Sequence, residues 1–326
     1  PGGGTTQDWF GYSVSISGDT ALVGWGREDS SVEDSGAAYV FVREPSTGVW
    51  SDQQKLEPSD PRFRGYFGNN VAVDGNIAIV GATGGAVPPY VSGAAYVFER
   101  DPATGVWTEI QKLAPTEVTA NNNAFGGAVA VEGERIVVGS NGEDVGVIDS
   151  GATYIYSRDS GTGLWALEQK IRASDAGASD AFGVSVSLSG DTVIVGAFFD
   201  DDNGSASGSA YVFVRDGGTG QWIQQQKLTA SDGAMFKYFG QSTALEGNLA
   251  FVGSPGADKA YVFERDPSNQ TWSETQIITP SITSGDFSES LAISGNQLVI
   301  GASRTNLSKG AAFIYSEAAN YNIDAS

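Results

Sequence analysis

Short runs of apolar residues alternate with turns along the whole chain, and they return in a fixed order. In the clearest copy, residues 184–188 alternate apolar and small polar side chains, which is typical of a strand with one buried face. Residues 189–191 read Ser-Gly-Asp and predict a hairpin turn, because glycine accepts the positive φ that such turns need. Residues 193–195 are continuously apolar, which indicates a strand buried on both faces.

Two further strands follow in the same copy, and the last is the most polar. Residues 210–213 read Ala-Tyr-Val-Phe after a variable loop, and residues 222–228 run from a Trp to Gln-Lys-Leu. Edge strands are commonly protected from unwanted pairing by Lys and other polar residues. The gradient therefore predicts a four-stranded sheet with crowded first strands and a fourth strand at a solvated edge.

The whole pattern repeats at intervals of 57 or 58 residues, with one shorter interval near the end. Each copy starts at a Phe that is followed by Gly, or by Ser in the last copy: Phe10, Phe67, Phe125, Phe182, Phe239 and Phe287. Four-stranded sheets repeated radially are the blades of a β-propeller. We therefore predict an all-β propeller in which six four-stranded blades, rather than seven, occupy residues 1–326 as a single domain.

The last copy departs from this pattern after residues 312–315. It lacks the Trp and the Gln-Lys-Leu strand, and residues 318–326 stand in their place. We predict that this tail completes the sixth blade as a ring-closing strand. The alternative is that a missing segment or a neighbouring subunit fills the open edge.

The composition narrows the chemistry that such a fold can support. The formal net charge is −21, from 39 acidic and 18 basic residues, so the surface repels nucleic acid and anionic membranes. Cys and His are both absent, which excludes disulfides, Cys or His zinc sites, and catalytic triads built on His. No apolar run approaches the ~20 residues of a membrane-spanning helix. We expect no zinc, haem or nucleotide, no nucleic-acid partner and no direct membrane insertion, and we expect oxygen ligands for any metal.

The fourth copy resembles the FG-GAP repeat of integrin α-subunit propellers and of bacterial and algal surface proteins. The resemblance rests on residues 182–183, 195–197, 200–204 and 208–213, which read Phe-Gly, Val-Gly-Ala, an acidic Gly-rich loop and Gly-Ser-Ala-Tyr-Val-Phe. Similar stretches extend it over residues 10–315. The resemblance implies a propeller, an extracellular or cell-surface location, and adhesion or ligand binding rather than catalysis. The integrin propeller has seven blades, so its ligand geometry is not carried over to six.

In this family some loops between the second and third strands hold calcium through an Asp-x-Asp-x-Asp-Gly series. Asp201 and Asn203 fit the second half of that series, with Asp200 and Asp202 beside them, whereas Phe199 stands where the first Asp is expected. Calcium takes about six to eight oxygen ligands, which a tight acidic turn can supply. The resemblance therefore implies a calcium site at these three Asp residues and the Asn, and a solvated acidic turn is the alternative.

Residues that break the repeat are the better candidates for recognition. Trp25 occurs where other copies have Ala or Ser, Phe198 and Phe199 follow the same point in the fourth copy, and Tyr90 lies in the loop of the second copy. We expect these loops on one face of the ring, where exposed aromatic side chains can stack on a sugar or anchor a protein. Local packing under long loops is the alternative explanation.

Three Asn residues carry the N-x-Ser/Thr sequence of N-glycosylation: Asn203, Asn269 and Asn306. They are meaningful only in a eukaryotic secretory setting.

The leading functional hypothesis is an extracellular, non-catalytic binding or adhesion module that recognises a protein or a carbohydrate through loops on one face. Two alternatives stay open. A structural subunit of an extracellular filament or surface layer would associate with copies of itself, whereas a receptor-like module would be monomeric. A glycan-active propeller enzyme would rely on Tyr, Arg, Asp and Glu, since His and Cys are missing. On the sequence alone we expect that the chain is not an enzyme.

Overall fold

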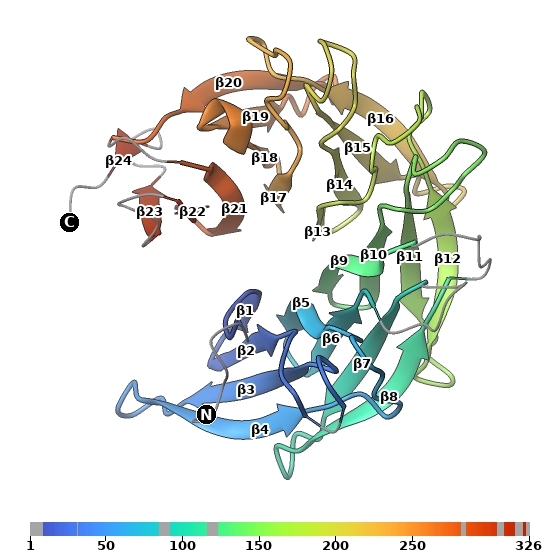
Figure 1. The fold of residues 1–326 in the computed structure, drawn as a ribbon, viewed down its shortest axis with the longest axis vertical. Helices are drawn as coiled ribbons and strands as arrows, with labels where there is room; N and C mark the ends of the chain where they lie inside the picture. Colours follow the sequence, from blue (N-terminus) through green and yellow to red (C-terminus); the bar gives the residue numbers. More distant parts are fainter. Residues whose placement is uncertain are drawn as a thin grey trace. The chain divides into compact units, whose positions relative to one another are not determined.

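The computed structural model describes residues 9–30, 32–84, 92–115, 123–281, 285–304 and 310–316, together with the backbone of Asn322 and Ile323. These residues form β-strands almost throughout (Figure 1). The one helix among them is a three-residue 3₁₀ turn, Pro255–Ala257, so no described helix is long and apolar enough to cross a membrane. The chain divides into two compact units, Pro1–Lys170 and Ile171–Ser326.

The strands form six antiparallel sheets of four, numbered here as blades 1 to 6, with neighbours in chain order. Blade 1 contains β1 (Val14–Ser17), β2 (Thr20–Trp25), β3 (Ala37–Arg43) and β4 (Trp50–Leu56). Blade 2 contains β5 (Phe67–Asp74), β6 (Ile77–Ala82), β7 (Ala94–Arg100) and β8 (Trp107–Leu113). Blade 3 contains β9 (Phe125–Glu132), β10 (Arg135–Ser140), β11 (Ala152–Arg158) and β12 (Trp165–Ile171), which ends at the boundary between the units.

The second unit holds the other three blades. Blade 4 contains β13 (Val186–Ser189), β14 (Thr192–Ala197), β15 (Ser209–Arg215) and β16 (Trp222–Leu228). Blade 5 contains β17 (Ser242–Glu246), β18 (Leu249–Ser254), β19 (Lys259–Arg265) and β20 (Trp272–Ile278). Blade 6 contains β21 (Phe287–Ser294), β22 (Gln297–Ala302), β23 (Ala311–Ser316) and β24 (Asn322–Ile323).

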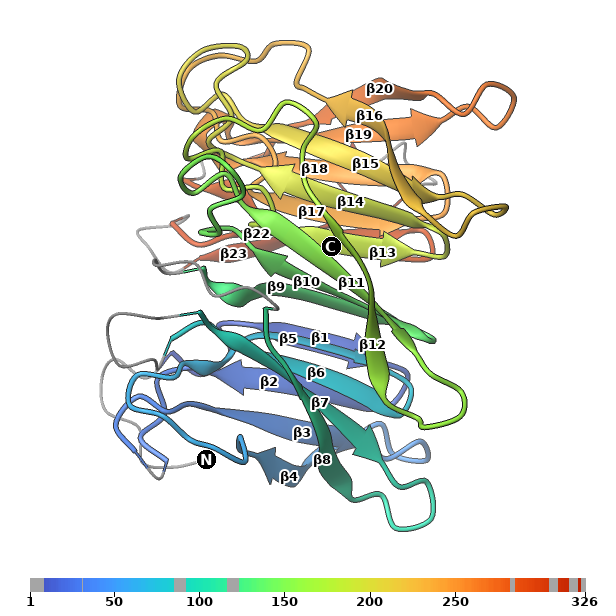
Figure 2. The same ribbon diagram turned by 90° about the vertical axis from the view of Figure 1, so that its right-hand side faces the viewer.

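These sheets confirm the predicted fold class: the chain is an all-β propeller of six four-stranded blades (Figures 1 and 2). β24 pairs with β23 at Ser316↔Asn322 and Tyr315↔Ile323, so the tail supplies the fourth strand of blade 6 as predicted. Its role in closing a ring stays a prediction.

The local structure follows the apolar pattern. All six residues of β6 and all six of β14 are buried, as their continuous apolar runs predict. Gly190 has a φ of +56° in the hairpin between β13 and β14, which glycine adopts without strain. β16 alternates exposed and half-buried positions at the outer edge of its sheet, in agreement with its polar sequence.

At three junctions, neighbouring blades within a unit approach closely at two glycines, one from each blade. One glycine is the last residue but one of the buried second strand, and the other belongs to the next Phe-Gly pair: Gly24 with Gly68, Gly81 with Gly126, and Gly196 with Gly240. A Cβ atom on Gly81 would lie 2.0 Å from the carbonyl oxygen of Gly126, so no larger residue fits there. Gly126 also has a φ of +86°, in the region that favours glycine.

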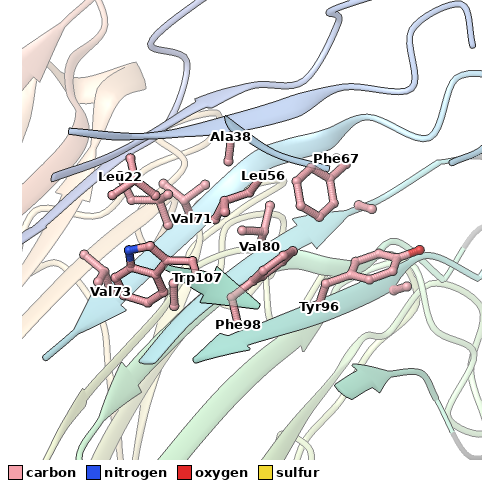
Figure 3. Packing of buried hydrophobic residues seen from close by; sticks show 14 residues of the cluster. Leu22, Ala38, Leu56, Phe67, Val71, Val73, Val80, Tyr96, Phe98 and Trp107 are labelled. Carbon is pink, nitrogen blue, oxygen red and sulfur yellow. The ribbon is translucent and has the colours of Figure 1, made fainter. Parts of the chain in front are cut away.

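Apolar side chains fill the junction around each glycine pair. Figure 3 shows the junction between blades 1 and 2, where Leu22 and Leu56 pack against Val71, Val73 and Trp107. All five side chains are buried. Burying an aliphatic side chain of this size contributes about 1.5–3 kcal/mol, so these junctions stabilise the unit more than any single hydrogen bond does.

A Gln on the fourth strand ties blades 1, 2 and 4 to the blade that follows each of them. The Gln111 side chain donates from Nε2 to the carbonyl oxygen of Trp165 at 2.8 Å and accepts the N–H of Trp165 at 2.7 Å. The same two bonds join Gln54 to Trp107 and Gln226 to Trp272. The side-chain amide therefore takes the place of a neighbouring strand, which explains why Gln and Trp recur at fixed positions in the repeat.

We expect Gly81→Ala to lower the free energy of unfolding by about 3 kcal/mol, because the new methyl group forces the two blades apart. Gly217→Ala is the matched control, since a Cβ there would meet no atom within 4 Å and Gly217 has no positive φ. Its effect should stay within about 0.5 kcal/mol. Urea denaturation followed by tryptophan fluorescence measures both, and equal stability of the two variants would contradict the close approach.

Candidate functional site

A Tyr, a carboxylate and a Lys meet at the same end of blades 1 to 5. In blade 4 the Tyr211 hydroxyl donates to Asp200 Oδ2 at 2.7 Å, and Lys227 Nζ lies 2.9 Å from the same oxygen. Buried hydroxyls and charges need such partners. The Tyr–carboxylate pairs are Tyr39–Glu28, Tyr96–Asp60, Tyr154–Glu143, Tyr211–Asp200 and Tyr261–Asp232.

The carboxylate of each cluster comes from one of two places in the sequence. Glu28, Glu143 and Asp200 are each the third residue after the end of the second strand. Blades 2 and 5 have no acid at that position, and Asp60 and Asp232 replace it from a Ser-Asp pair that follows the fourth strand of the preceding blade.

Blade 5 also replaces the Lys. Ile277 stands where blades 1 to 4 have the Lys of their fourth strand, and Lys259 at the start of β19 forms the ion pair with Asp232 instead. Since the cluster is rebuilt from different residues, it belongs to the scaffold and ties the loops to the ends of the strands. By itself it does not mark a functional site.

Blade 4 carries more carboxylates at this end than the scaffold cluster needs. Lys227 Nζ lies 2.8 Å from Asp175, 2.9 Å from Asp200 and 2.5 Å from Asp202. Oxygen atoms of the three Asp side chains all lie within 4.8 Å of one another. Burial lowers the pKa of Lys227, but its hydrogen bonds to the three carboxylates outweigh burial and raise the pKa overall. One ammonium therefore faces three carboxylates, and the group has an excess of negative charge.

Asp180 is a further acid beside this group. Its environment raises its pKa, whereas the environment of Asp175 lowers the pKa of that residue. It is only 7% exposed, and the N–H of Gly177 donates to its Oδ2. Burial, with a smaller contribution from the charges of Asp200 and Asp201, raises the pKa of Asp180 above its ordinary value of 3.8. Burial would also raise the pKa of Asp175, but its hydrogen bond to Lys227 reverses this and lowers it. Neighbouring carboxyl groups whose pKa values move apart can divide the roles of proton donor and acceptor.

An aromatic shelf, formed by Phe198, Phe199, Met235, Phe236 and Tyr238, borders the acidic group. The rings of Phe198 and Phe199 have centroids 3.8 Å apart, and Phe199 lies 6.0 Å from Tyr238. Backbone hydrogen bonds from Phe236 and Tyr238 hold the connection into blade 5 against the blade 4 loop. Phe199, Met235 and Phe236 are exposed, so this shelf presents apolar surface beside carboxylates.

The predicted calcium residues lie in this loop, but their side chains have different partners. Asp200 and Asp202 share Lys227, whereas Asp201 accepts a backbone N–H of its own loop, and Asn203 is exposed. The structure thus brings together two of the four predicted ligands. Calcium at this position would compete with the ammonium for the same oxygens, and it stays a prediction.

The other predicted binding residues differ in how far they are exposed to solvent. Trp25 is buried, with its ring 5.3 Å from Phe10 and 5.9 Å from Tyr39, which agrees with the alternative of local packing. Phe198 is half-buried and Phe199 is exposed on the aromatic shelf. Tyr90 lies outside the described residues.

Two of the three glycosylation sequons can be placed. Asn203 and Asn269 are exposed, and Asn306 lies outside the described residues. Asn269 Oδ1 accepts hydrogen bonds from the N–H and the hydroxyl of Thr271. Modification of these residues stays a prediction.

Sequence reasoning missed Asp175, Asp180 and Lys227. Lys227 looked like an ordinary charge on an edge strand, because its contacts depend on how the loops fold over the sheet. The signal for Asp175 was present in the sequence, since it belongs to one of three Ser-Asp pairs that follow fourth strands. Asp180 stands at a position that changes from copy to copy, so no repeated pattern indicated it.

The fold and its repeated junctions define a β-propeller of short repeats, and comparison with known proteins identifies its family. The FG-GAP repeat matches residues 1–41, 50–98, 107–156, 165–213 and 222–263. The chain therefore belongs to the FG-GAP repeat family, which confirms the resemblance. From the second block on, each match begins at a fourth-strand Trp and ends in the third strand of the following blade. No curated protein matches the chain.

Solved structures with the same fold include three bacterial proteins. A protein from Lactobacillus plantarum is 14% identical with a TM-score of 0.63, over 96% of this chain and 82% of its own. A putative 6-phosphogluconolactonase from Bacteroides uniformis is 13% identical with a TM-score of 0.64, over 94% and 80%. A periplasmic gluconolactonase from Pseudomonas aeruginosa is 14% identical with a TM-score of 0.60, over 91% and 82%.

These names correct two predictions made from the sequence. The prediction of a non-catalytic adhesion module was wrong, and so was the prediction that the chain is not an enzyme, because two of these propellers are named as enzymes. The error came from reading the FG-GAP resemblance and the missing His as evidence against catalysis. At 13–14% identity the likeness shows the fold alone, so a particular activity is a proposal.

We expect Lys227→Met to lower the free energy of unfolding by about 3 kcal/mol near neutral pH, because buried Asp200 loses its cation. The pKa of Asp175 is lowered in the folded chain, so its share of this stability exists above pH 3.8 and disappears as the pH falls further. The loss measured by urea denaturation should therefore shrink in acid. Adding Asp200→Asn should recover part of it. A loss that is the same at every pH would contradict the ion-pair explanation.

Proposed function

We propose that the chain is a hydrolase that acts on a sugar-derived substrate, such as the cyclic ester of a sugar acid, at the loop end of blade 4. The observation that carries this proposal is the buried carboxyl group of Asp180, which lies close enough to Asp200 and Lys227 to be affected by their charges, together with the exposed aromatic shelf. The lactonase names of two propellers with the same fold support it.

Hydrolysis of a cyclic ester needs a group that takes a proton from water and returns one to the leaving oxygen. Asp180 is our candidate, because its raised pKa brings the carboxyl group closer to the pH at which it exchanges protons. Water adds to the carbonyl carbon as Asp180 takes its proton, and the ring C–O bond then breaks as the proton passes to the ring oxygen. Lys227 positions Asp175 and Asp202, and its hydrogen bond to Asp175 lowers the pKa of that carboxyl group.

The aromatic shelf suits the apolar face of a sugar ring. Exposed apolar surface beside a few polar groups is a combination that small-molecule sites commonly use. Phe199 directly precedes Asp200, and its N–H donates to the carbonyl oxygen of Asp180 at 3.4 Å, so the shelf and the acids are fixed to one another. Of the two ligand classes expected from the sequence, a protein or a carbohydrate, we therefore propose the carbohydrate.

The charge of the site favours an uncharged substrate. Three carboxylates face one ammonium, and the chain carries a formal charge of −21. A phosphorylated sugar lactone would be repelled. We also propose a location outside the cytoplasm, which the name of one propeller with the same fold, a periplasmic gluconolactonase, supports.

We expect the protein to hydrolyse glucono-δ-lactone faster than buffer does, and 6-phosphogluconolactone at least about tenfold more slowly, measured as proton release in a pH-stat. Asp180→Asn should reduce the rate about 100-fold, within the range of general-base effects. The rate should rise with pH through a midpoint above 3.8, since Asp180 acts when deprotonated. Glu134→Gln in an exposed turn is the matched control. Equal rates for wild type, Asp180→Asn and buffer would refute the proposal.

Calcium is a second, separable part of the proposal. Asp200 and Asp202 from the predicted set, joined by Asp175, offer carboxylate oxygens that fit a cation. Lys227 is their counter-ion in this structure, so calcium can bind only if the ammonium withdraws. A bound ion would stiffen the loop that carries the aromatic shelf.

We expect millimolar calcium to raise the thermal midpoint of the wild type and excess chelator to reverse the shift, because a ligand that binds the folded state stabilises it. The shift should be larger in Lys227→Met and absent in Asp202→Asn. Magnesium at the same ionic strength controls for screening. A midpoint that calcium leaves unchanged in both wild type and Lys227→Met would rule out this site.

A further inference from the structure

The loop end of blade 1 carries a second shelf, built at the same positions of the repeat as the aromatic shelf of blade 4. Arg27 is the second residue after β2, as Phe199 is the second residue after β14. Tyr66 stands directly before a Phe-Gly pair, as Tyr238 does. We call the side chains at these positions of blade 1 and its connection into blade 2 the basic shelf: Arg27, Phe63, Arg64 and Tyr66.

Equivalent backbone hydrogen bonds hold the two shelves. The N–H groups of Arg64 and Tyr66 donate to two carbonyl oxygens of the loop between β2 and β3, at 2.9 and 3.1 Å. Those of Phe236 and Tyr238 donate to the equivalent oxygens of the blade 4 loop, at 2.8 and 3.1 Å. All four residues have φ between +53° and +58°. The two shelves therefore share one backbone arrangement and differ in their side chains.

The difference between the shelves is one of charge. Arg27 and Arg64 occur where the aromatic shelf has Phe199 and Phe236. Apolar surface remains beside them, since Phe63 is 54% exposed at the position of Met235. The basic shelf thus combines an exposed ring with two guanidinium groups in a chain whose formal charge is −21.

Aromatic rings, and no carboxylate of the described residues, hold the Arg27 side chain. Its guanidinium carbon lies 3.9 Å from the centre of the Trp9 ring and 5.9 Å from that of Tyr66. Within the described part of the chain it forms no ion pair, although acidic residues outnumber basic ones by 39 to 18. Stacking on a ring orients a guanidinium group and leaves the N–H donors in its plane available to a ligand.

The carboxylates near Arg64 are weak partners. Its Nη2 atom lies 3.6 Å from Glu33 Oε1, and its Nε atom lies 3.7 Å from Asp34 Oδ2. The side chains of Arg64 and Glu33 are 56% and 60% exposed. Exposed ion pairs of this length contribute little to stability, so an anionic ligand can take their place.

We propose that the basic shelf binds a sugar that carries a carboxylate, with Arg27 and Arg64 on the carboxylate and Phe63 against the sugar ring. The planar fork of a guanidinium group matches the two oxygens of a carboxylate. The choice of a sugar rests on the proposed function, because it is taken from the equivalent shelf of blade 4. The need for a negative charge follows from the two Arg residues alone.

Two sources supply a sugar of this chemistry. One is the free sugar acid that hydrolysis of a cyclic ester releases, and the other is a uronic acid unit of a polysaccharide. Both present a carboxylate beside a polyhydroxylated carbon skeleton, so the shelf recognises the same groups in either.

Isothermal titration calorimetry with sodium gluconate, tri-galacturonate and methyl glucoside tests the proposal. We expect one or both of the carboxylated sugars to bind at least about tenfold more tightly than uncharged methyl glucoside, because charge-assisted hydrogen bonds are lost with the carboxylate. Binding of gluconate indicates the free acid, and binding of tri-galacturonate alone indicates the polysaccharide. Equal binding of all three, or of none, would overturn the proposal.

Three variants assign the binding to the basic shelf. Arg27→Gln and Arg64→Gln should each weaken it about tenfold or more, and Arg27→Lys should weaken it less, since Lys keeps the charge but loses the fork. Arg43→Gln is the matched control, because Arg43 ends β3 at the opposite end of blade 1 and is also exposed. Equal effects of Arg64→Gln and Arg43→Gln would overturn the proposal, and the exposed side chain of Arg64 keeps that comparison free of folding defects.

Hydrolysis of glucono-δ-lactone, measured with the same proteins, separates this inference from the proposed function. We expect Arg27→Gln to lose gluconate binding and to keep the wild-type rate of hydrolysis. A wild type that binds gluconate through Arg27 without hydrolysing the lactone would refute the proposed function alone. A wild type that hydrolyses the lactone but binds neither carboxylated sugar at the basic shelf would overturn this inference alone.

Discussion

The close approach of two glycines at the junctions of blades 1 and 2, 2 and 3, and 4 and 5 is the constraint on which the structure depends. Gly81 and Gly126 leave no room for a Cβ atom, so the backbones of neighbouring blades come near enough for Val and Leu side chains to interdigitate around them. The Phe beside the second glycine is fully buried from blade 2 onwards, as Phe67 illustrates. Contacts between blades, more than pairing inside a sheet, therefore explain which residues recur in each copy of the repeat.

The fold could be read from the sequence because its signals repeat. Alternation, hairpin glycines and buried runs recur in each copy. The last copy lacks the fourth-strand pattern, and β24 was predicted only from the position of the tail after residues 312–315. The exposure of single residues could not be read in this way. Trp25 looked like a recognition residue because it breaks the repeat, yet it fills space beside Phe10 and Tyr39. A substitution in a repeat marks a changed environment without saying whether that environment faces solvent.

The candidate site was only partly predictable from the sequence. The acidic loop after β14 stood out, but its meaning depended on Lys227, which reaches it from a strand 27 residues away in sequence from Asp200. The recurring Tyr–carboxylate–Lys cluster shows how a scaffold device becomes a distinctive site: blade 4 keeps the shared elements and adds Asp175, Asp180 and Asp202. Residues added to a repeated cluster cannot be recognised in the sequence until the structure has shown which residues form the cluster.

The register of the family match has a consequence for how such proteins change length. Each matched block from residue 50 onwards begins in the fourth strand of one blade and ends in the third strand of the next, so it spans a junction. A gene duplication with these limits would insert a fourth strand with its Gln and a following blade with its Phe-Gly pair in a single event. The inserted segment would fit its neighbours on both sides without compensating mutations, and variation could then accumulate in the loops while the stack stayed intact.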